Sequence, residues 1–207
     1  MIERPAPGEE LNAGTPTVPR PAATVILLRG GGVSLEVLLV RRNPRARFMG
    51  GAWVFPGGAV ERSEGSGDQA LRRAAVRELA EEAGIATTPE ALVPFARWIT
   101  PAEVKTRFDT WFFLACAPAG AEPRIDGSEV VDARWCEPAQ ALDAARRGEL
   151  PLVFPTIKQL EQLAHFSSAE ALLAHTRGRP VRPVQPRVVR SGETARIVLP
   201  GEPDDGD

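Results

Sequence analysis

Short apolar runs alternate along the chain with segments rich in glycine, proline and charge. Residues 23–29 and 35–41 are apolar and partly β-branched, and the glycines at positions 30–32 predict a turn that joins them as two strands. A third apolar run, at 53–55, stops abruptly at Pro56-Gly57-Gly58. Further runs of the same kind predict strands over 92–99, 108–117 and 130–135.

One segment has the period of a helix instead. Apolar side chains recur every four residues from Leu71 to Ala83, and this row predicts a helix over 68–83. Gly84 follows at the position of a helix C-cap, where glycine adopts the left-handed conformation most easily. Shorter helices are predicted over 138–147, 156–166 and 169–175.

The two ends of the chain differ in composition from its centre. Residues 1–22 hold five prolines and show no periodicity, which indicates a flexible or loosely docked tail. A hairpin over 186–190 and 195–199, turning at Ser191-Gly192, is predicted ahead of a second, acidic tail at 200–207. Residues 23–199 are enough for a single domain, and the order of its elements makes it a mixed α+β domain.

Charge and cysteine content narrow the class of protein. The formal net charge is -2 and the sequence pI is about 5.8, so no overall attraction to nucleic acid or to an anionic membrane is expected. Cys116 and Cys136 lack the spacing of a metal site and are too few for a disulfide framework, which favours a reducing compartment. No apolar run is long enough for a signal peptide or a membrane span. We therefore expect a soluble, cytoplasmic protein.

Glu78, Glu81 and Glu82 lie at i, i+3 and i+4 of the predicted helix, with Arg77 beside them. This spacing brings three carboxylates onto one side of the helix, where they repel one another unless a cation neutralises them. Oxygen ligands at this density suit a hard cation such as Mg²⁺ or Mn²⁺. Taken alone, the cluster is explained equally well as a solvated helix face. The preceding glycine turn favours the metal site, because glycines allow the backbone to approach a metal and phosphate closely.

The nine residues from Arg77 to Ile85, R-E-L-A-E-E-A-G-I, resemble the second half of the Nudix box, G-x5-E-x7-R-E-U-x-E-E-x-G-U, where U is a bulky aliphatic residue. Gly58 and Glu64 match its first half. Twelve residues separate Glu64 from Arg77, five more than in the family's pattern, and the loop at 65–67 with an added helical turn can absorb them. The role of Glu64 therefore stays open.

The resemblance implies an α/β/α sandwich with a mixed β-sheet and a metal-dependent hydrolase that cleaves a diphosphate linkage. By the same resemblance the cofactor is Mg²⁺ or Mn²⁺, and its ligands are Glu78, Glu82, Glu81 and the Gly58 carbonyl. Arg77 would orient Glu78. The metal ions would bind the diphosphate oxygens and lower the pKa of the water that attacks phosphorus, so that no covalent enzyme intermediate is needed.

The general base of a Nudix enzyme often comes from outside the box. Three acidic residues on predicted loops or strand ends are candidates, namely Glu103, Asp109 and Glu129. Glu103 is the first choice, although each of the three also fits an ordinary surface position.

Residues upstream of the box bear on the substrate. The segment from Leu38 to Gly58 resembles the signature of the coenzyme A diphosphatase branch, L-L-T-x-R-[S/A]-x3-R-x3-G-x3-F-P-G-G, and departs from it at Val40 and Asn43. By this resemblance the substrate contacts are Arg42, Arg47, Gly57 and Gly58. Several arginines in this segment also suit a ligand that carries a 3'-phosphate besides its diphosphate.

Two later strings, W-I-T-P at 98–101 and R-F-D-T at 107–110, resemble the acyl-CoA-cleaving, peroxisomal type of Nudix protein and its bacterial relatives. The expected small-molecule substrate is coenzyme A or an acyl-CoA, cleaved to 3',5'-ADP and phosphopantetheine. The alternatives are an ADP-ribose or dinucleotide diphosphatase, and a non-catalytic Nudix-fold module that binds a nucleotide. The segment from residue 156 onward could cap the pocket or form the contact of a homodimer, and its residues do not decide between the two.

Overall fold

The strands of the chain build one mixed β-sheet and a separate hairpin. The computed structural model describes residues 10–12, 14–31, 34–46, 48–191 and 194–202. The strands in these residues are β1 (Arg20–Arg29), β2 (Glu36–Arg42), β3 (Trp53–Val54), β4 (Gly57–Ala59), β5 (Val93–Ile99), β6 (Phe108–Cys116), β7 (Val130–Cys136), β8 (Pro183–Val184), β9 (Arg187–Ser191) and β10 (Thr194–Val198). The hairpin consists of β9 and β10, and the other eight strands form the sheet.

β1 and β6 form the centre of the sheet. They run parallel, in register from Arg20 opposite Phe108 to Leu28 opposite Cys116. The order along the sheet is β3-β2-β1-β6-β5-β8, and β4 and β7 pair additionally with β1 and β2. Residues 22–28 of β1 are buried without interruption, as expected for a strand covered on both faces.

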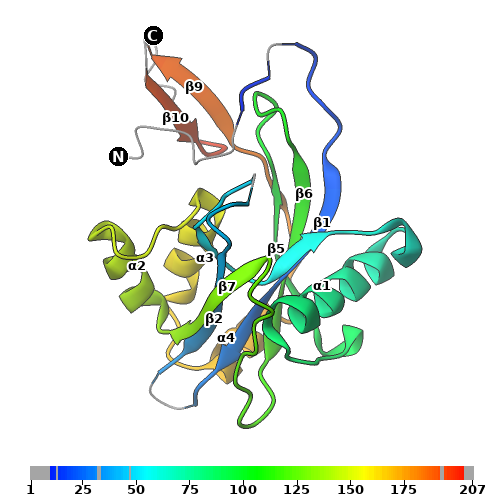
Figure 1. Ribbon diagram of the computed structural model, residues 1–207, viewed down its shortest axis with the longest axis vertical. Coiled ribbons are helices and arrows are strands. Elements are labelled where there is room, and N and C mark those ends of the chain that lie inside the picture. The colour runs from blue at the N-terminus through cyan, green and yellow to red at the C-terminus, as the bar shows by residue number, and fades with distance from the viewer. Residues whose placement is uncertain (1–9, 13, 32–33, 47, 192–193, 203–207) are drawn as a thin grey trace.

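Helices cover both faces of the sheet (Figure 1). α1 (Asp68–Ala83) packs on one face, and α2 (Pro138–Arg146), α3 (Phe154–Leu163) and α4 (Ala169–Thr176) pack on the other. Two separate apolar clusters correspond to these layers, one around Val25, Leu79 and Phe113 and the other around Ile26 and Leu160. The expected α/β/α sandwich with a mixed sheet is therefore confirmed.

α1 lies between two glycines. Gly67 is its N-cap and Gly84 its C-cap, with φ angles of 80° and 64° that a residue with a side chain rarely adopts. The predicted limits of this helix, 68 and 83, are confirmed. Its apolar row is buried against the sheet, with Leu79 fully inaccessible to solvent. The helix is thus held rigidly where its acidic side faces the glycine turn.

Two elements begin earlier than the sequence pattern indicates. β1 starts at Arg20 rather than at residue 23, because β6 offers it hydrogen-bonding partners from Phe108 onward. α3 starts at Phe154 rather than at 156, with Pro155 in its first turn, where a missing backbone N–H costs nothing. Both shifts place side chains at the same end of the sheet.

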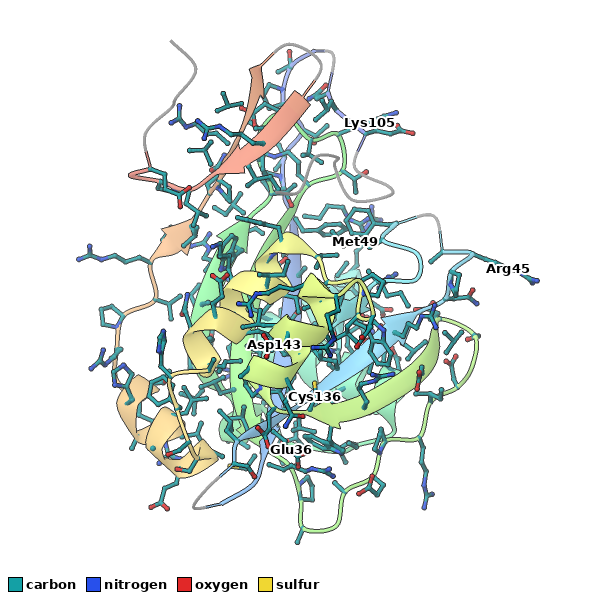
Figure 2. All side chains as sticks on the ribbon, turned by 90° about the vertical axis from the view of Figure 1, so that its left-hand side faces the viewer. Glu36, Arg45, Met49, Lys105, Cys136 and Asp143 are labelled. Atoms are coloured by element: carbon teal, nitrogen blue, oxygen red, sulfur yellow. The ribbon has the colours of Figure 1, made fainter. Side chains whose placement is uncertain are left out.

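The hairpin of β9 and β10 lies at that end, near the loop that carries Lys105 (Figures 1 and 2). Glu103 in this loop accepts a hydrogen bond at Oε2 from the Val188 N–H, 3.4 Å away. The segment before β1 contacts the same loop, since Asn12 N–H donates to the Glu103 carbonyl at 2.6 Å. Gly192 in the predicted turn lies outside the described residues.

The helices are short in relation to a lipid bilayer. Within the part of the chain that the structure describes, no helix has the length and hydropathy needed to span a membrane.

Candidate active site

The glycine turn after β3 is locked to α1 by a carboxylate. The Gly57 N–H donates to Glu82 Oε2 at 2.9 Å, across 25 residues of sequence. A Cβ at Gly58 would overlap the Glu78 carboxylate, and one at Gly57 would overlap Thr24 on β1. A side chain at 57 would collide with the backbone of β1, and one at 58 would displace the Glu78 carboxylate, so both glycines allow the close approach that the sequence indicates.

Arg77 connects the two halves of the acidic motif. Its Nε donates to Glu64 Oε1 at 3.0 Å, and its Nη1 donates to Glu78 Oε1 and Glu81 Oε2, both at 2.8 Å. A fourth bond runs from Nη2 to the Ala59 carbonyl at 3.1 Å. Burial lowers the pKa of Arg77, but its three carboxylate partners outweigh this effect and raise it above its ordinary value.

Glu64, whose role the sequence leaves open, is the buried partner of Arg77. Its second oxygen accepts the Glu61 N–H at 2.7 Å, which fixes the carboxylate in place. The additional residues between Glu64 and Arg77 form the short turn 65–67 and the start of α1. The longer spacing thus preserves the ion pair.

Burial disfavours the charged forms of Glu78 and Glu82. Burial raises the pKa of Glu82 to about 7, against the Gly57 hydrogen bond and the Arg42 charge, which lower it. Burial also raises the pKa of Glu78, and Arg77 counteracts it in part. Glu129 raises the pKa of both carboxyls by like-charge repulsion. Two glutamates held this way are ready to accept a cation.

A cavity of about 440 Å³ opens next to this cluster. Glu78, Glu82 and Glu129 form one end of its lining, together with the glycine turn. Two cations, Arg20 and Arg42, also line it. Within the described residues neither has an acidic side chain at salt-bridge distance, so both are available to an anionic ligand.

The rest of the cavity wall is mainly apolar. It is built by side chains from the loop before β3, from β5 and β6, from the start of α3, and from β9 and β10. The larger members are Phe48, Met49, Trp98, Phe108, Phe112, Phe154, Val188 and Ile197. The site thus combines an acidic end with a long apolar surface, an arrangement typical of pockets for small molecules.

The structure brings some of the predicted site residues together and separates others. Glu78, Glu82, Gly57, Gly58 and Arg42 all line the cavity. Glu81 lies outside its lining, on the exposed side of α1, where it pairs with Arg77. Arg47 lies outside the described residues. Its neighbour Arg45 extends into solvent (Figure 2).

The three candidate bases occupy different surroundings. Asp109 forms a bidentate ion pair with Arg97, whose Nε and Nη2 donate to its two carboxylate oxygens at 2.8 and 2.7 Å. Among the described residues that line the cavity, Asp109 is not included. Glu103 is also absent from that lining, and its carboxylate holds the Val188 N–H of β9. Glu129, by contrast, lines the cavity next to the glutamates of α1.

Arg20 is a site residue that sequence reasoning missed. It stands in the proline-rich segment interpreted as a tail, and the parallel register of β1 and β6 places it over the Phe108 ring, 5.8 Å from the centroid. The last hairpin adds apolar side chains to the cavity lining, although the residues of the segment from 156 onward left a cap over the pocket and a dimer contact as alternatives. Neither the position of Arg20 nor that of the hairpin has a local sequence signal, because both depend on pairing between distant segments.

A family model described as the NUDIX domain matches residues 18–155. The chain belongs to the Nudix family. Nudix hydrolase 7 of Caenorhabditis elegans is 28% identical over 209 residues, covering 83% of this chain and 69% of the relative. The acyl-coenzyme A diphosphatase NUDT19 of Xenopus laevis is 24% identical over 66% of this chain and 62% of its own length.

Among solved structures, the Nudix hydrolase from Alicyclobacillus acidocaldarius has a TM-score of 0.71 and 30% sequence identity, and the match covers 79% of this chain and 99% of that one. These similarities and the intact acidic cluster identify a Nudix pyrophosphohydrolase that acts on nucleoside diphosphate derivatives.

Nudix hydrolases generally use divalent metal ions, and the donor set here suits one. In the described residues no three acidic, His or Cys side chains converge closely enough to enclose an ion as they stand. Glu78 and Glu82 nevertheless supply oxygen donors, and burial raises the pKa of both because it disfavours their charged forms. A hard cation would remove that penalty, so the residues fit the cofactor.

Proposed function

We propose that this Nudix hydrolase cleaves the diphosphate linkage of coenzyme A or of an acyl-CoA, releasing 3',5'-ADP and phosphopantetheine or its acyl form. The observation that supports the proposal is the composition of one cavity, whose lining combines carboxylates, two arginines and a large apolar surface. Coenzyme A derivatives combine the matching groups: a diphosphate, a further phosphate and an extended arm. The coenzyme A branch signature at 38–58 points in the same direction.

Glu78 and Glu82 are proposed to hold Mg²⁺ or Mn²⁺, with the Gly58 carbonyl and Glu81 as further ligands. When bound, the metal neutralises charge on the diphosphate and activates the attacking water. Arg77 positions Glu78 through its 2.8 Å hydrogen bond, and Glu64 in turn holds Arg77. Arg42 lies in the cavity wall, where its guanidinium would contact a substrate phosphate. Arg47 remains a second proposed phosphate contact.

Glu129 is proposed as the general base in preference to Glu103 and Asp109. Its carboxylate lines the cavity and acts electrostatically on both Glu78 and Glu82, so it is close enough to take a proton from water in the site. The Glu103 carboxylate accepts a hydrogen bond from β9, and Asp109 is paired with Arg97.

Free Cys116 and Cys136 support our placement of the protein in the cytoplasm.

Mass spectrometry of reaction products tests the substrate. Purified protein is incubated with Mg²⁺ or Mn²⁺ and, separately, with coenzyme A, acetyl-CoA, ADP-ribose, NADH and a diadenosine polyphosphate. The proposal expects 3',5'-ADP with phosphopantetheine or its acetyl form. AMP formed from ADP-ribose or from a dinucleotide alone would keep the hydrolase and reject coenzyme A. Ligand-induced thermal stabilisation without any product would identify a nucleotide-binding module instead.

A further inference from the structure

The cavity wall extends beyond the part of the chain that the family model matches. That match ends at residue 155, whereas Thr156, Pro186, Val188 and Ile197 all line the cavity. Three of these four side chains are apolar, and the fourth, Thr156, is almost fully buried. The last quarter of the chain therefore contributes to the lining of the site.

Val188 and Ile197 form a matched pair in this wall. They are directly opposite each other in the antiparallel register of β9 and β10. Side chains at opposed positions lie on the same face of a hairpin, so both point to the cavity that they line. Val189 and Arg196, the next opposed pair, lie on the other face.

The hairpin is fastened to the sheet on two sides. β8, which leads into it, pairs with β5 at Arg97 and Trp98. The Glu103 carboxylate accepts the Val188 N–H, and Leu199 at its far end packs against the core. These contacts hold the hairpin where Val188 and Ile197 line the cavity.

Aromatic side chains also line the cavity. Phe48 and Phe108 pack against each other with ring centroids 5.7 Å apart, and Trp98 meets Phe154 edge to face at 6.1 Å. A polar group placed among these rings and the hairpin would lose its hydrogen bonds to water without replacement. An apolar arm would gain from the same transfer.

We propose that Val188 and Ile197 form an acyl-binding wall, which makes this enzyme prefer diphosphate substrates with an apolar acyl chain over the same substrates without one. The occupant is part of the substrate because the apolar side chains line the same cavity as Glu78 and Glu82, the proposed ligands of the metal that would bind the diphosphate. The inference rests on the proposed function and adds to it the chemical class of the substrate's arm and the residues that select its length. It also assigns the C-terminal segment to the cavity.

A series of substrates that differ only in acyl length tests the preference. Coenzyme A and its acetyl, butanoyl, hexanoyl and decanoyl thioesters are compared by kcat/KM with Mg²⁺. Each methylene buried against the hairpin is expected to raise kcat/KM by about threefold, until the cavity is full. A kcat/KM that does not change with acyl length overturns the proposal.

Two variants of the hairpin locate the effect. Ile197→Trp fills the space next to Val188 and is expected to lower the ratio of kcat/KM for the decanoyl thioester to that for coenzyme A by at least tenfold. Val188→Ala removes contact without adding bulk and is expected to reduce the gain per methylene. Val189→Ala, on the opposite face, is the matched control and should keep the wild-type profile. Profiles that change equally in all three variants contradict the assignment.

The failure of this inference is distinct from the failure of the proposed function. Cleavage of all the thioesters at one rate would leave coenzyme A as the substrate and remove only the acyl-binding wall. Absence of cleavage for the whole series, with thermal melting that shows folded protein, would remove the proposed substrate itself. Melting curves of each variant identify any change that comes from loss of folding.

Discussion

Arg77 and Glu64 form a buried ion pair across 13 residues of sequence, with Nε and Oε1 at 3.0 Å. The pair ties the turn after β4 to the start of the acidic segment of α1. Arg77 uses its other nitrogens for Glu78, Glu81 and the Ala59 carbonyl. Glu64 therefore determines the orientation of the residue that orients Glu78.

Glu64→Gln tests this positioning. The variant removes the charge of the buried carboxylate, and the free energy of unfolding should fall by about 1–2 kcal/mol, since Arg77 retains two other carboxylate partners and the Ala59 carbonyl. Turnover should fall by roughly tenfold, as for other groups that orient metal ligands. Urea unfolding and steady-state kinetics measure both effects. Glu90→Gln, at an exposed position, is the control. Equal turnover in the two variants would contradict the role of Glu64 in positioning Arg77.

Gly58→Ala tests the close approach of the glycine turn to α1. The added Cβ would overlap the Glu78 carboxylate and displace it, so kcat should fall by about two orders of magnitude. Gly31→Ala is a suitable comparison, because a Cβ at Gly31 has no atom within 4 Å among the described residues. Similar kcat values for the two variants would show that the turn does not constrain the site.

Glu129→Gln and Glu103→Gln distinguish the two candidate bases. Loss of a general base typically costs two or more orders of magnitude in rate, and we expect a fall of about 100-fold for Glu129→Gln. Glu103→Gln alters only the contact with β9 and should retain most of the turnover of coenzyme A. Measurement of kcat at saturating substrate shows which of the two variants loses more turnover. A larger loss of kcat in Glu103→Gln than in Glu129→Gln would favour Glu103 as the general base.

The metal-free protein should lose stability as pH rises through the weakly acidic range. Burial raises the pKa of Glu82 from its ordinary value of 4.5 to about 7, so the folded state holds this proton more tightly than the unfolded state does. The resulting stabilisation is complete below about pH 4.5 and is lost as pH rises towards 7.

Glu82→Gln removes this dependence. In EDTA the variant should become more stable than the wild type by on the order of 2 kcal/mol as pH increases from 4.5 to 8. Urea unfolding at both pH values measures the difference. Saturating Mn²⁺ should restore the stability of the wild type at pH 8 but not raise that of the variant equally. A difference between the proteins that is independent of pH would contradict this account.

Local sequence signals were sufficient to predict α1 and the glycine turn at residues 56–58. The row from Leu71 to Ala83 and the C-cap glycine describe a helix whose limits the structure confirms. The motif also contains Glu78 and Glu82, which converge on Gly57 and Gly58. These features are local, because an i, i+4 row and a glycine cap do not depend on the rest of the chain.

Features that depend on pairing between distant segments could not be predicted in the same way. Arg20 reaches the cavity only because β1 continues alongside β6 to Phe108. Glu103, Asp109 and Glu129 are similar in local sequence, and the tertiary positions of the segments that carry them decide which one lines the cavity. The hairpin was predicted as an element, but its position over the cavity follows from contacts with β5 and Glu103.

Hydrolysis of acetyl-CoA by wild type, Glu78→Gln and Glu82→Gln tests the central claim most directly, with Mg²⁺ or Mn²⁺ in one set of reactions and EDTA in the other. The account predicts metal-dependent cleavage by the wild type and a loss of at least 100-fold in both variants, each of which still melts cooperatively. Rates in both variants equal to that of the wild type would contradict the assignment of the catalytic site to this face of α1.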